Sequence, residues 1–217
     1  FCTLKLQRKT KLKKSFINLI FLITLIFPLY SLAALEPEEL VKKTAEDVIF
    51  AIKADEEIQK GNKEKIYKLA EDKILPNFDF DRISRLVLGR AWRKTNENQK
   101  KGFIKEFRTL LLKTYAVALS KYKDQKIVFK PTRMSKGDEI VIVKSEIVQN
   151  GGQPIKVNYA LSNNSGKWLV FDIVIEGVSL VTNYRSQFSS EIKRNGIDVL
   201  IDKLAKKNKG KKNDGAN

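Results

Sequence analysis

Histidine is absent from the 217-residue sequence, and cysteine occurs only once, as Cys2. Without histidine the chain lacks the commonest general base and the commonest metal ligand of proteins. Cys2 precedes a segment that we expect to be removed on export, so the remaining chain has no disulfide and no thiol chemistry. These absences argue against an enzyme and against any metal or cofactor.

The carboxylates are a weak substitute for these missing groups. Asp79 and Asp81 flank Phe80, and Glu71 and Asp72 lie shortly before them. A catalytic carboxylate pair needs a defined cleft and a defined separation, which this spacing does not indicate. An aspartate directly before an apolar helical pattern is typical of a helix cap, and we assign Asp79 that role.

Residues 1–33 have the pattern of an export signal. Six Lys and Arg residues precede an apolar run from Phe16 to Leu29, and Ser31-Leu32-Ala33 supplies the small residues that a signal peptidase reads. The run is shorter than the roughly 20 residues of a membrane-spanning helix. We expect cleavage near Ala33 and a mature domain over residues 34–205; a retained N-terminal anchor is the alternative.

The chain is strongly basic. Its formal charge is +17, and removal of the six cations of residues 1–33, which contain no acid, leaves +11. A basic cytoplasmic protein would suggest nucleic acid, but an exported one meets anionic membrane surfaces or acidic proteins instead. Residues 206–217 are rich in Lys, Gly and Asn, and we expect a disordered tail there.

The hydrophobic periodicity predicts helices first, strands second and helices again. Pro37 marks the first helix start, Asn96 and Gln99 resemble a capping box, and Asn195-Gly196 marks a helix stop. The predicted helices span 37–60, 63–74, 80–88, 97–121, 184–194 and 197–204, and the predicted strands span 126–130, 139–148, 155–162 and 167–175. Short turns between strands favour antiparallel pairing, so the fold class is α+β.

Two of these strands are apolar on both faces, at residues 139–143 and 168–175. A sheet with one wet face would alternate more cleanly. Helices that cover both faces are one explanation. A curved sheet with one face lining an apolar cavity is the other, and periodicity alone leaves both open.

Two blocks of the sequence carry a resemblance to a known family. The first is Leu86-Val87-Leu88-Gly89-Arg90-Ala91-Trp92-Arg93-Lys94-Thr95, continued by Gln99, Phe103, Phe107, Leu111 and Tyr115. The second is Trp168-Leu169-Val170-Phe171-Asp172-Ile173-Val174-Ile175-Glu176-Gly177-Val178-Ser179-Leu180, continued by Asn183-Tyr184-Arg185-Ser186-Gln187-Phe188 and Gly196-Ile197-Asp198. These blocks resemble the MlaC family, which is also called the toluene-tolerance family. The resemblance extends over the mature chain to about Leu204.

The resemblance implies an antiparallel sheet of the nuclear-transport-factor or cystatin kind, wrapped by helices around an apolar pocket. It implies a periplasmic phospholipid carrier that shuttles lipid between the outer membrane and an inner-membrane ABC transporter and so maintains outer-membrane asymmetry. The implied partners are the substrate-binding and permease components of that transporter and an outer-membrane lipoprotein and porin complex, with no nucleic acid. We expect the pocket to be lined by Leu111, Tyr115, Leu119, Val141, Val143, Val157, Tyr159, Ile173, Ile175, Val178 and Leu180, with Val178 in a turn at its mouth.

Three other functions compete with this hypothesis. The first is a carrier of a different lipid, such as a hopanoid, and the second is an envelope adaptor with a filled core and no ligand. The third is a basic nucleic-acid binder, which would require a retained N-terminus and a cytoplasmic location. Glu176 and Arg185 are interpreted as structural residues that pair with each other or cap the helix near Tyr184.

Overall fold

The computed structural model describes residues 36–149, 151–164 and 166–210, so the predicted export signal lies outside the described residues. A five-stranded antiparallel sheet has the order β1-β2-β3-β4-β5, in which each strand pairs with the next along the chain. The strands are β1 (Lys126–Phe129), β2 (Ile140–Val148), β3 (Ile155–Asn164), β4 (Lys167–Ile175) and β5 (Val178–Ser179). The predicted antiparallel α+β fold is confirmed.

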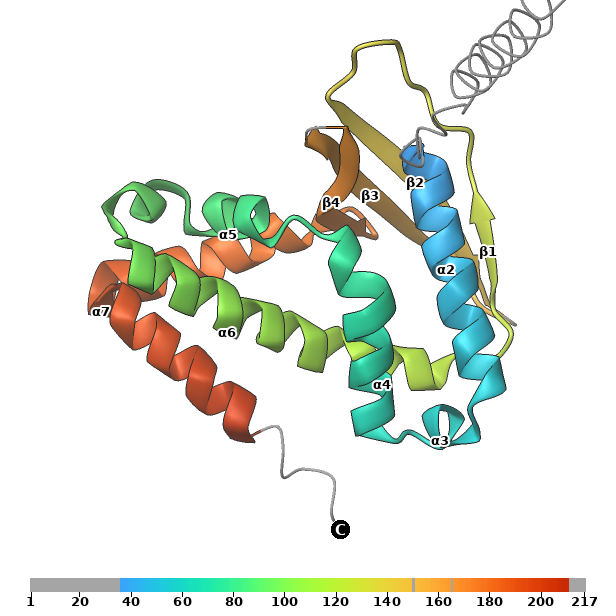
Figure 1. The fold of residues 1–217 in the computed structure, drawn as a ribbon, viewed down its shortest axis with the longest axis horizontal. Coiled ribbons are helices and arrows are strands. Elements are labelled where there is room, and N and C mark those ends of the chain that lie inside the picture. The colour runs from blue at the N-terminus through green and yellow to red at the C-terminus, as the bar shows by residue number, and fades with distance from the viewer. Residues whose placement is uncertain (1–35, 150, 165, 211–217) are drawn as a thin grey trace, which may run out of the picture. The chain divides into compact units, whose positions relative to one another are not determined.

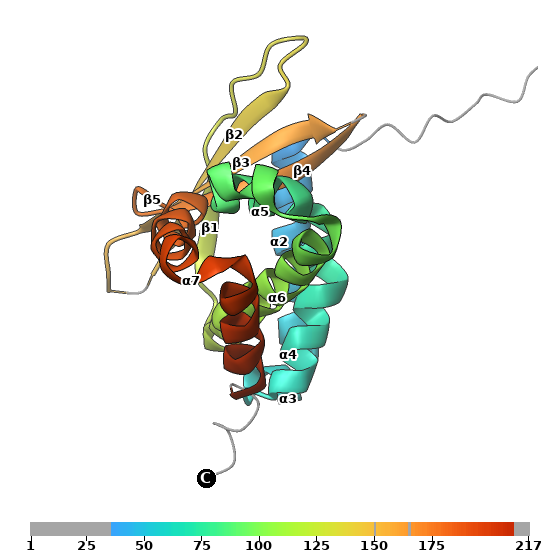
Figure 2. The same cartoon turned by 90° about the vertical axis from the view of Figure 1, so that its left-hand side faces the viewer.

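Helices precede and follow this sheet along the chain. Those before it are α2 (Pro37–Ala54), α3 (Glu56–Gln59), α4 (Lys63–Leu69), the π-helical turn η1 (Ala70–Ile74), the 3₁₀ turn η2 (Leu75–Asn77), α5 (Phe80–Leu88), η3 (Gly89–Lys94), α6 (Glu97–Tyr115) and η4 (Ala116–Lys121). Helix α7 (Leu180–Gly210) follows β5. In Figure 1, α2 stands in front of the sheet with α4 beside it, and Figure 2 shows β2, β3 and β4 above α6 and the second half of α7.

The predicted helix starts have the caps that their sequences indicate. Asp79 accepts a hydrogen bond from the Arg82 backbone N–H at 2.8 Å, which confirms its role as the cap of α5. Asn96 and Gln99 form the reciprocal capping box of α6, and the Gln99 amide also donates to the Asp198 carboxylate at 2.9 Å. The capping box therefore also ties the start of α6 to α7.

An irregularity in β4 settles which strand residues face the helices. Ala160 pairs with Asp172 but the next residue, Leu161, pairs with Val170, so Phe171 is an extra residue on β4. Such a bulge reverses the alternation of side chains along a strand. Trp168 and Val170 before the bulge therefore share the inner face of the sheet with Ile173 after it.

The outer face of β2 is uncovered. Val141 and Val143 are buried on the inner face, whereas Ile140 and Ile142 are each 52% exposed. Within the described ranges no helix packs over these two side chains. The expectation that both apolar faces of this strand are covered is wrong, because only the inner face has a partner layer.

The largest of three hydrophobic clusters among the described residues lies between α5, α6 and α7. Phe107 is fully buried and contacts Phe103, Tyr184 and Phe188, with ring centroids 5.1–5.6 Å apart. These aromatic rings come from helices that are nearly 80 residues apart in the sequence. Their packing fixes α7 against α6 and so determines where the sheet lies relative to both.

The C-terminal helix agrees with the prediction at its internal break and differs from it at its C-terminal end. A kink at Gly196, with φ 83° and ψ 171°, separates its two halves at the predicted stop. The second half then continues to Gly210, beyond the predicted boundary at residue 205. The physical reason is Asn208, which is buried and donates to the Glu106 carbonyl at 2.9 Å, so residues 206–210 are ordered helix. Residues 211–217 lie outside the described part of the chain.

Candidate functional site

An apolar cavity of about 540 Å³ lies between α2 and the inner face of the sheet. Ligand sites of proteins typically enclose roughly 300–1,000 Å³. Helix α2 supplies one wall, η1, η2 and η4 supply the sides, and the strands supply the floor. The lining residues are Leu40, Val41, Thr44, Ala45, Val48, Ile49, Ile52, Ile74, Asn77, Phe78, Ala118, Leu119, Lys121, Tyr122, Gln125, Ile127, Ile147, Gln149, Ile155, Tyr159, Val170 and Ile173.

The cavity opens at η4. Among the lining residues only Ala118 and Lys121 are exposed, and both belong to this short helix. Gln125 and Gln149 lie close to the same end, at the start of β1 and just after β2. Near the start of α2 the lining residues Val41 and Val170 are buried. The cavity is therefore largely apolar, and its exposed lining residues lie on η4.

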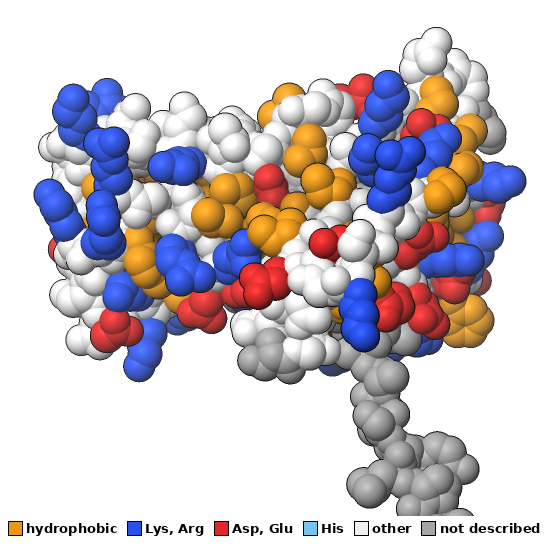
Figure 3. Space-filling view, turned by 90° about the horizontal axis from the view of Figure 1, so that it is seen from above, with side chains coloured by type: hydrophobic (Ala, Val, Ile, Leu, Met, Phe, Trp, Pro, Cys, Tyr) orange, Lys and Arg blue, Asp and Glu red, His pale blue; other side chains and the backbone are white. Residues whose placement is uncertain are grey.

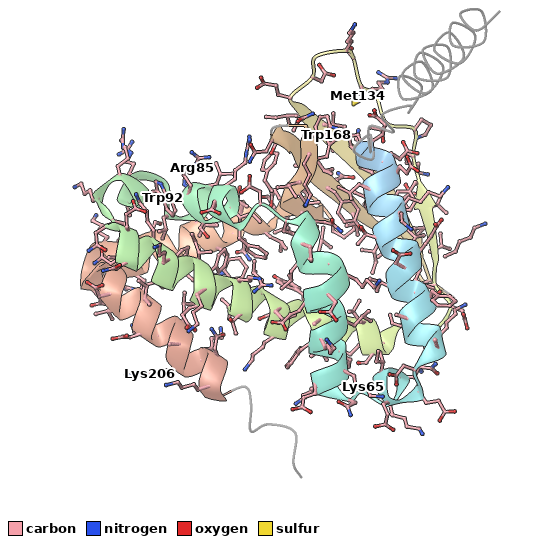
Figure 4. All side chains as sticks on the ribbon, viewed as in Figure 1. Lys65, Arg85, Trp92, Met134, Trp168 and Lys206 are labelled. Carbon is pink, nitrogen blue, oxygen red and sulfur yellow. The ribbon has the colours of Figure 1, made fainter. Side chains whose placement is uncertain are left out.

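The end near the start of α2 packs against a hydrophobic cluster that contains Trp168. Figure 4 shows this side chain between the sheet and the start of α2, with Met134 above it on the loop between β1 and β2. Trp168 packs with Val41, Val141 and Leu161. The backbone N–H of Thr132 donates to the Glu38 carboxylate at 3.0 Å, which holds the same loop to α2.

A second, much smaller cavity of about 30 Å³ adjoins the first. Phe78 and Ile173 line both cavities and form the partition between them. The other walls of the small cavity come from α5, α6, Phe171 and the start of α7. Its volume corresponds to about one water molecule, so only the larger cavity accommodates an organic ligand.

The structure brings three of the predicted pocket residues together in the large cavity: Leu119, Tyr159 and Ile173. Tyr159 and Ile173 are paired on β3 and β4. Burial raises the pKa of the Tyr159 hydroxyl, whereas its hydrogen bond with Ser145 acts in the opposite direction. Tyr159 is therefore a neutral wall residue near pH 7.

The other predicted residues lie elsewhere. Leu111 and Leu180 line the small cavity, and Val141, Val143 and Val157 are ordinary core. Ile175 is half-buried and does not line the large cavity.

Two of the predicted residues, Tyr115 and Val178, are exposed. Tyr115 is 38% exposed and its hydroxyl is hydrogen-bonded with that of Tyr184. Val178 is 57% exposed and pairs with Ile175 in the short strand β5. Val178 does not line the large cavity, because Glu176 and Gly177, both with positive φ, form a tight hairpin turn that pairs Val178 with the end of β4.

The largest group of lining residues that sequence reasoning missed belongs to α2. Leu40, Val48, Ile49 and Ile52 recur at helical spacing, so the apolar face itself is visible in the sequence. Nothing in that spacing distinguishes a cavity wall from a core face. No sequence pattern indicated that the π-helical turn η1 and the residues around Phe78 would line a cavity.

Glu176 and Arg185 have structural roles, although they do not pair with each other. The Glu176 carboxylate accepts a hydrogen bond from the Lys156 backbone N–H and ties the hairpin turn to β3. Arg185 packs over Gly89, where an added Cβ would lie 3.1 Å from the guanidinium nitrogen. The start of α7 is capped instead by Asp172, which accepts from the Val181 backbone N–H at 3.1 Å and from the Ser179 hydroxyl at 2.5 Å.

The surface around the fold is predominantly basic. In the space-filling view of Figure 3, Lys and Arg side chains gather at both ends of the face, with hydrophobic side chains between them. Across residues 36–149, 151–164 and 166–210, no helix is both long and apolar enough to span a membrane. The same ranges contain no group of three or more Asp or Glu side chains that could hold a metal ion.

This architecture defines a class of protein: an α+β domain in which an antiparallel sheet and a helix enclose a largely apolar cavity. A family model described as "MlaC protein" matches residues 42–206 of this chain. Because the match covers more than half of the chain, the protein belongs to the MlaC family.

Individual relatives agree with this assignment. The chain is 29% identical over 174 residues to the toluene tolerance protein ttg2D of Pseudomonas putida, with 80% of each chain covered. It is 28% identical over 198 residues to the intermembrane phospholipid transport system binding protein MlaC of Haemophilus influenzae, covering 89% of this chain and 92% of that one.

A solved structure has the same fold. It is a phospholipid-binding protein from Ralstonia solanacearum, determined in complex with a phospholipid, with a TM-score of 0.76 and 32% sequence identity. The alignment covers 82% of the present chain and 99% of that one. The shared architecture therefore extends over almost the whole of the related structure.

Proposed function

We propose that this protein is a phospholipid carrier of the Mla transport system. The observation that carries the proposal is the largely apolar cavity of about 540 Å³, in which Lys121 is the only lining residue with a charged side chain. An apolar space whose exposed lining residues lie on one short helix suits an amphiphile whose acyl chains enter and whose headgroup stays at the surface. The phospholipid bound by the related Ralstonia protein supports the same ligand class.

The physics of lipid transfer explains why such a cavity is needed. Each methylene that leaves water contributes about 0.8 kcal/mol, so two chains of roughly 15 methylenes cost about 24 kcal/mol to expose. Release into water is therefore too slow to be useful. The carrier must deliver its lipid while docked to a membrane or to another protein that offers an apolar surface.

The proposed route connects the two membranes of the cell envelope. Cleavage of residues 1–33 would leave the domain in the periplasm, where an inner-membrane ABC transporter and an outer-membrane lipoprotein and porin complex are the proposed docking partners. The chain itself carries out no catalysis in this scheme, and the transporter supplies the energy.

Lipid extraction from the purified protein tests the proposal directly. The full chain is expressed with its own N-terminus in a Gram-negative host, purified from the periplasmic fraction without detergent, and extracted with organic solvent. Mass spectrometry should find phospholipid in an amount close to that of the protein. Polycyclic triterpenoids in place of phospholipid would support the hopanoid alternative, and an extract with no lipid at all would support a ligand-free adaptor.

A further inference from the structure

The exposed end of the cavity contains a cation that has no ion-pair partner among the described residues. Lys121 ends η4, its side chain is exposed, and it is the only Lys, Arg, Asp or Glu among the residues that line the cavity. Among the described residues no carboxylate lies within ion-pairing distance of its ammonium group. The cation is therefore available to a ligand.

The nearest acid in the sequence is already neutralised by another lysine. The Asp124 carboxylate lies 2.6 Å from Lys53 Nζ, and the same ammonium group lies over the Tyr122 ring. This pair raises the pKa of Lys53 through its hydrogen bond with Asp124. Lys53 and Asp124 thus satisfy each other, and Lys121 remains the unpaired charge at the mouth.

Two amide side chains line the same cavity as this cation. The Gln125 side-chain oxygen accepts a hydrogen bond from the Lys123 backbone N–H at 2.6 Å, which leaves the Gln125 NH₂ group as a donor. Gln149 lines the same end of the cavity. An ammonium group together with amide donors, placed where an apolar cavity meets water, is suited to an anionic oxygen group on an amphiphile.

We propose that Lys121, assisted by the amide of Gln125, binds the phosphate of the lipid headgroup and so selects phosphate-bearing lipids over neutral lipids with the same acyl chains. This inference rests on the proposed function, since it requires acyl chains in the cavity. Neutral diacylglycerol would fill the apolar cavity equally well. Discrimination between the two ligands therefore has to come from the mouth.

The experiment compares two ligands that differ only in the headgroup. Lipid-stripped full-length protein is incubated with detergent micelles that carry equal amounts of dioleoyl phosphatidylglycerol and dioleoylglycerol, and the bound lipids are quantified after gel filtration. The variants are Lys121→Glu, Lys121→Gln and Lys121→Arg. The matched control is Lys144→Glu, which makes the same charge change at an exposed lysine on the outer face of the sheet.

The wild type and Lys121→Arg should prefer the phospholipid, and Lys121→Glu should reduce the bound ratio of phospholipid to diacylglycerol by about tenfold, because a charge-assisted hydrogen bond is replaced by repulsion. Lys121→Gln should fall between them, and Lys144→Glu should match the wild type. Diacylglycerol that still binds to Lys121→Glu serves as the internal evidence that the cavity has folded.

Three results would overturn the inference. An unchanged ratio in Lys121→Glu would leave lipid carriage intact but remove Lys121 from headgroup recognition. An equal loss in Lys144→Glu would attribute the effect to net charge alone. Binding of inorganic phosphate alone, lost in Lys121→Glu, would identify an ion site instead of a headgroup site. Failure of the wild type to bind either lipid is a different outcome, since it would contradict the proposed function itself.

Discussion

Tyr159 and Ile173 stand directly opposite each other on β3 and β4, and both side chains line the large cavity. The pair forms the middle of the cavity floor, beneath helix α2. A charged group at either position would have to enter an apolar space with no partner. The floor of the cavity is therefore the place where a single substitution should separate lipid binding from folding.

Ile173→Glu should lower the phospholipid that co-purifies with the protein by about tenfold or more, because a carboxylate in the floor destabilises buried acyl chains. The matched control is Val178→Glu, which changes an exposed residue of β5. This control should keep its lipid, and its stability should stay within about 0.5 kcal/mol of the wild type. Equal lipid loss in both variants, measured by mass spectrometry of extracts, would contradict the assignment of the cavity floor.

A second substitution tests the cavity without introducing a charge, so the assignment can be checked even if Ile173→Glu unfolds the protein. Ala45 lines the opposite wall, on α2, so Ala45→Trp adds apolar bulk to the cavity without a charge. We expect this variant to retain the far-UV circular dichroism of the wild type and to bind less lipid. Full lipid content in a folded Ala45→Trp protein would show that the acyl chains lie elsewhere.

The sequence shows that residues 168–175 carry apolar side chains on both faces of the strand. It does not show the structural reason for this pattern. Trp168 and Val170 face inward at even positions, and Ile173 faces inward at an odd position, because Phe171 is an inserted residue. Periodicity assumes constant parity along a strand. A bulge depends on how the neighbouring strand pairs, so it cannot be derived from one strand alone.

Patterns among residues close in sequence predicted the helix boundaries well, but they predicted the cavity poorly. The capping box at Asn96, the cap at Asp79 and the break at Gly196 all depend on neighbours in sequence, and all are present in the structure. The cavity depends on α2 lying over strands that are about 100 residues distant. Its helix was predicted, but the partner of its apolar face was not.

The kink in α7 requires a backbone conformation that favours glycine at position 196. Gly196 has φ 83° and ψ 171°, a region that only glycine adopts readily, so Gly196→Ala should destabilise the protein by about 1–3 kcal/mol. Gly102→Ala, inside α6, should have the opposite effect and stabilise it by about 0.5–1 kcal/mol. Its new Cβ would lie 3.7 Å from Ile201, an ordinary contact. Urea unfolding of both variants measures the two changes, and equal signs would contradict the assigned backbone conformation.

Alkaline pH should weaken the helical core through Tyr184. Burial, together with its hydrogen bond to Tyr115, holds the pKa of the Tyr184 hydroxyl well above the value of about 10 in an unfolded chain. The folded state therefore retains this proton while the unfolded state loses it. Stability should be constant below pH of about 10 and fall as the pH rises above it. Tyr184→Phe should show a smaller decline in urea midpoint over this range, and an identical decline would assign the effect to other groups.

Phe78 should set how far acyl chains extend, because with Ile173 it separates the large cavity from the small one. Phe78→Ala would join the two spaces, and the lipids that co-purify should shift toward longer acyl chains, at a stability cost of about 2 kcal/mol for a half-buried phenyl ring. Phe80→Ala is the matched control, since Phe80 stacks on Phe78 with ring centroids 6.0 Å apart but lines neither cavity. The control should lose similar stability and keep the wild-type chain-length distribution. Mass spectrometry of both extracts distinguishes the cases: a shift in both variants would indicate general loosening of the fold, and no shift in Phe78→Ala would show that acyl chains end short of the partition.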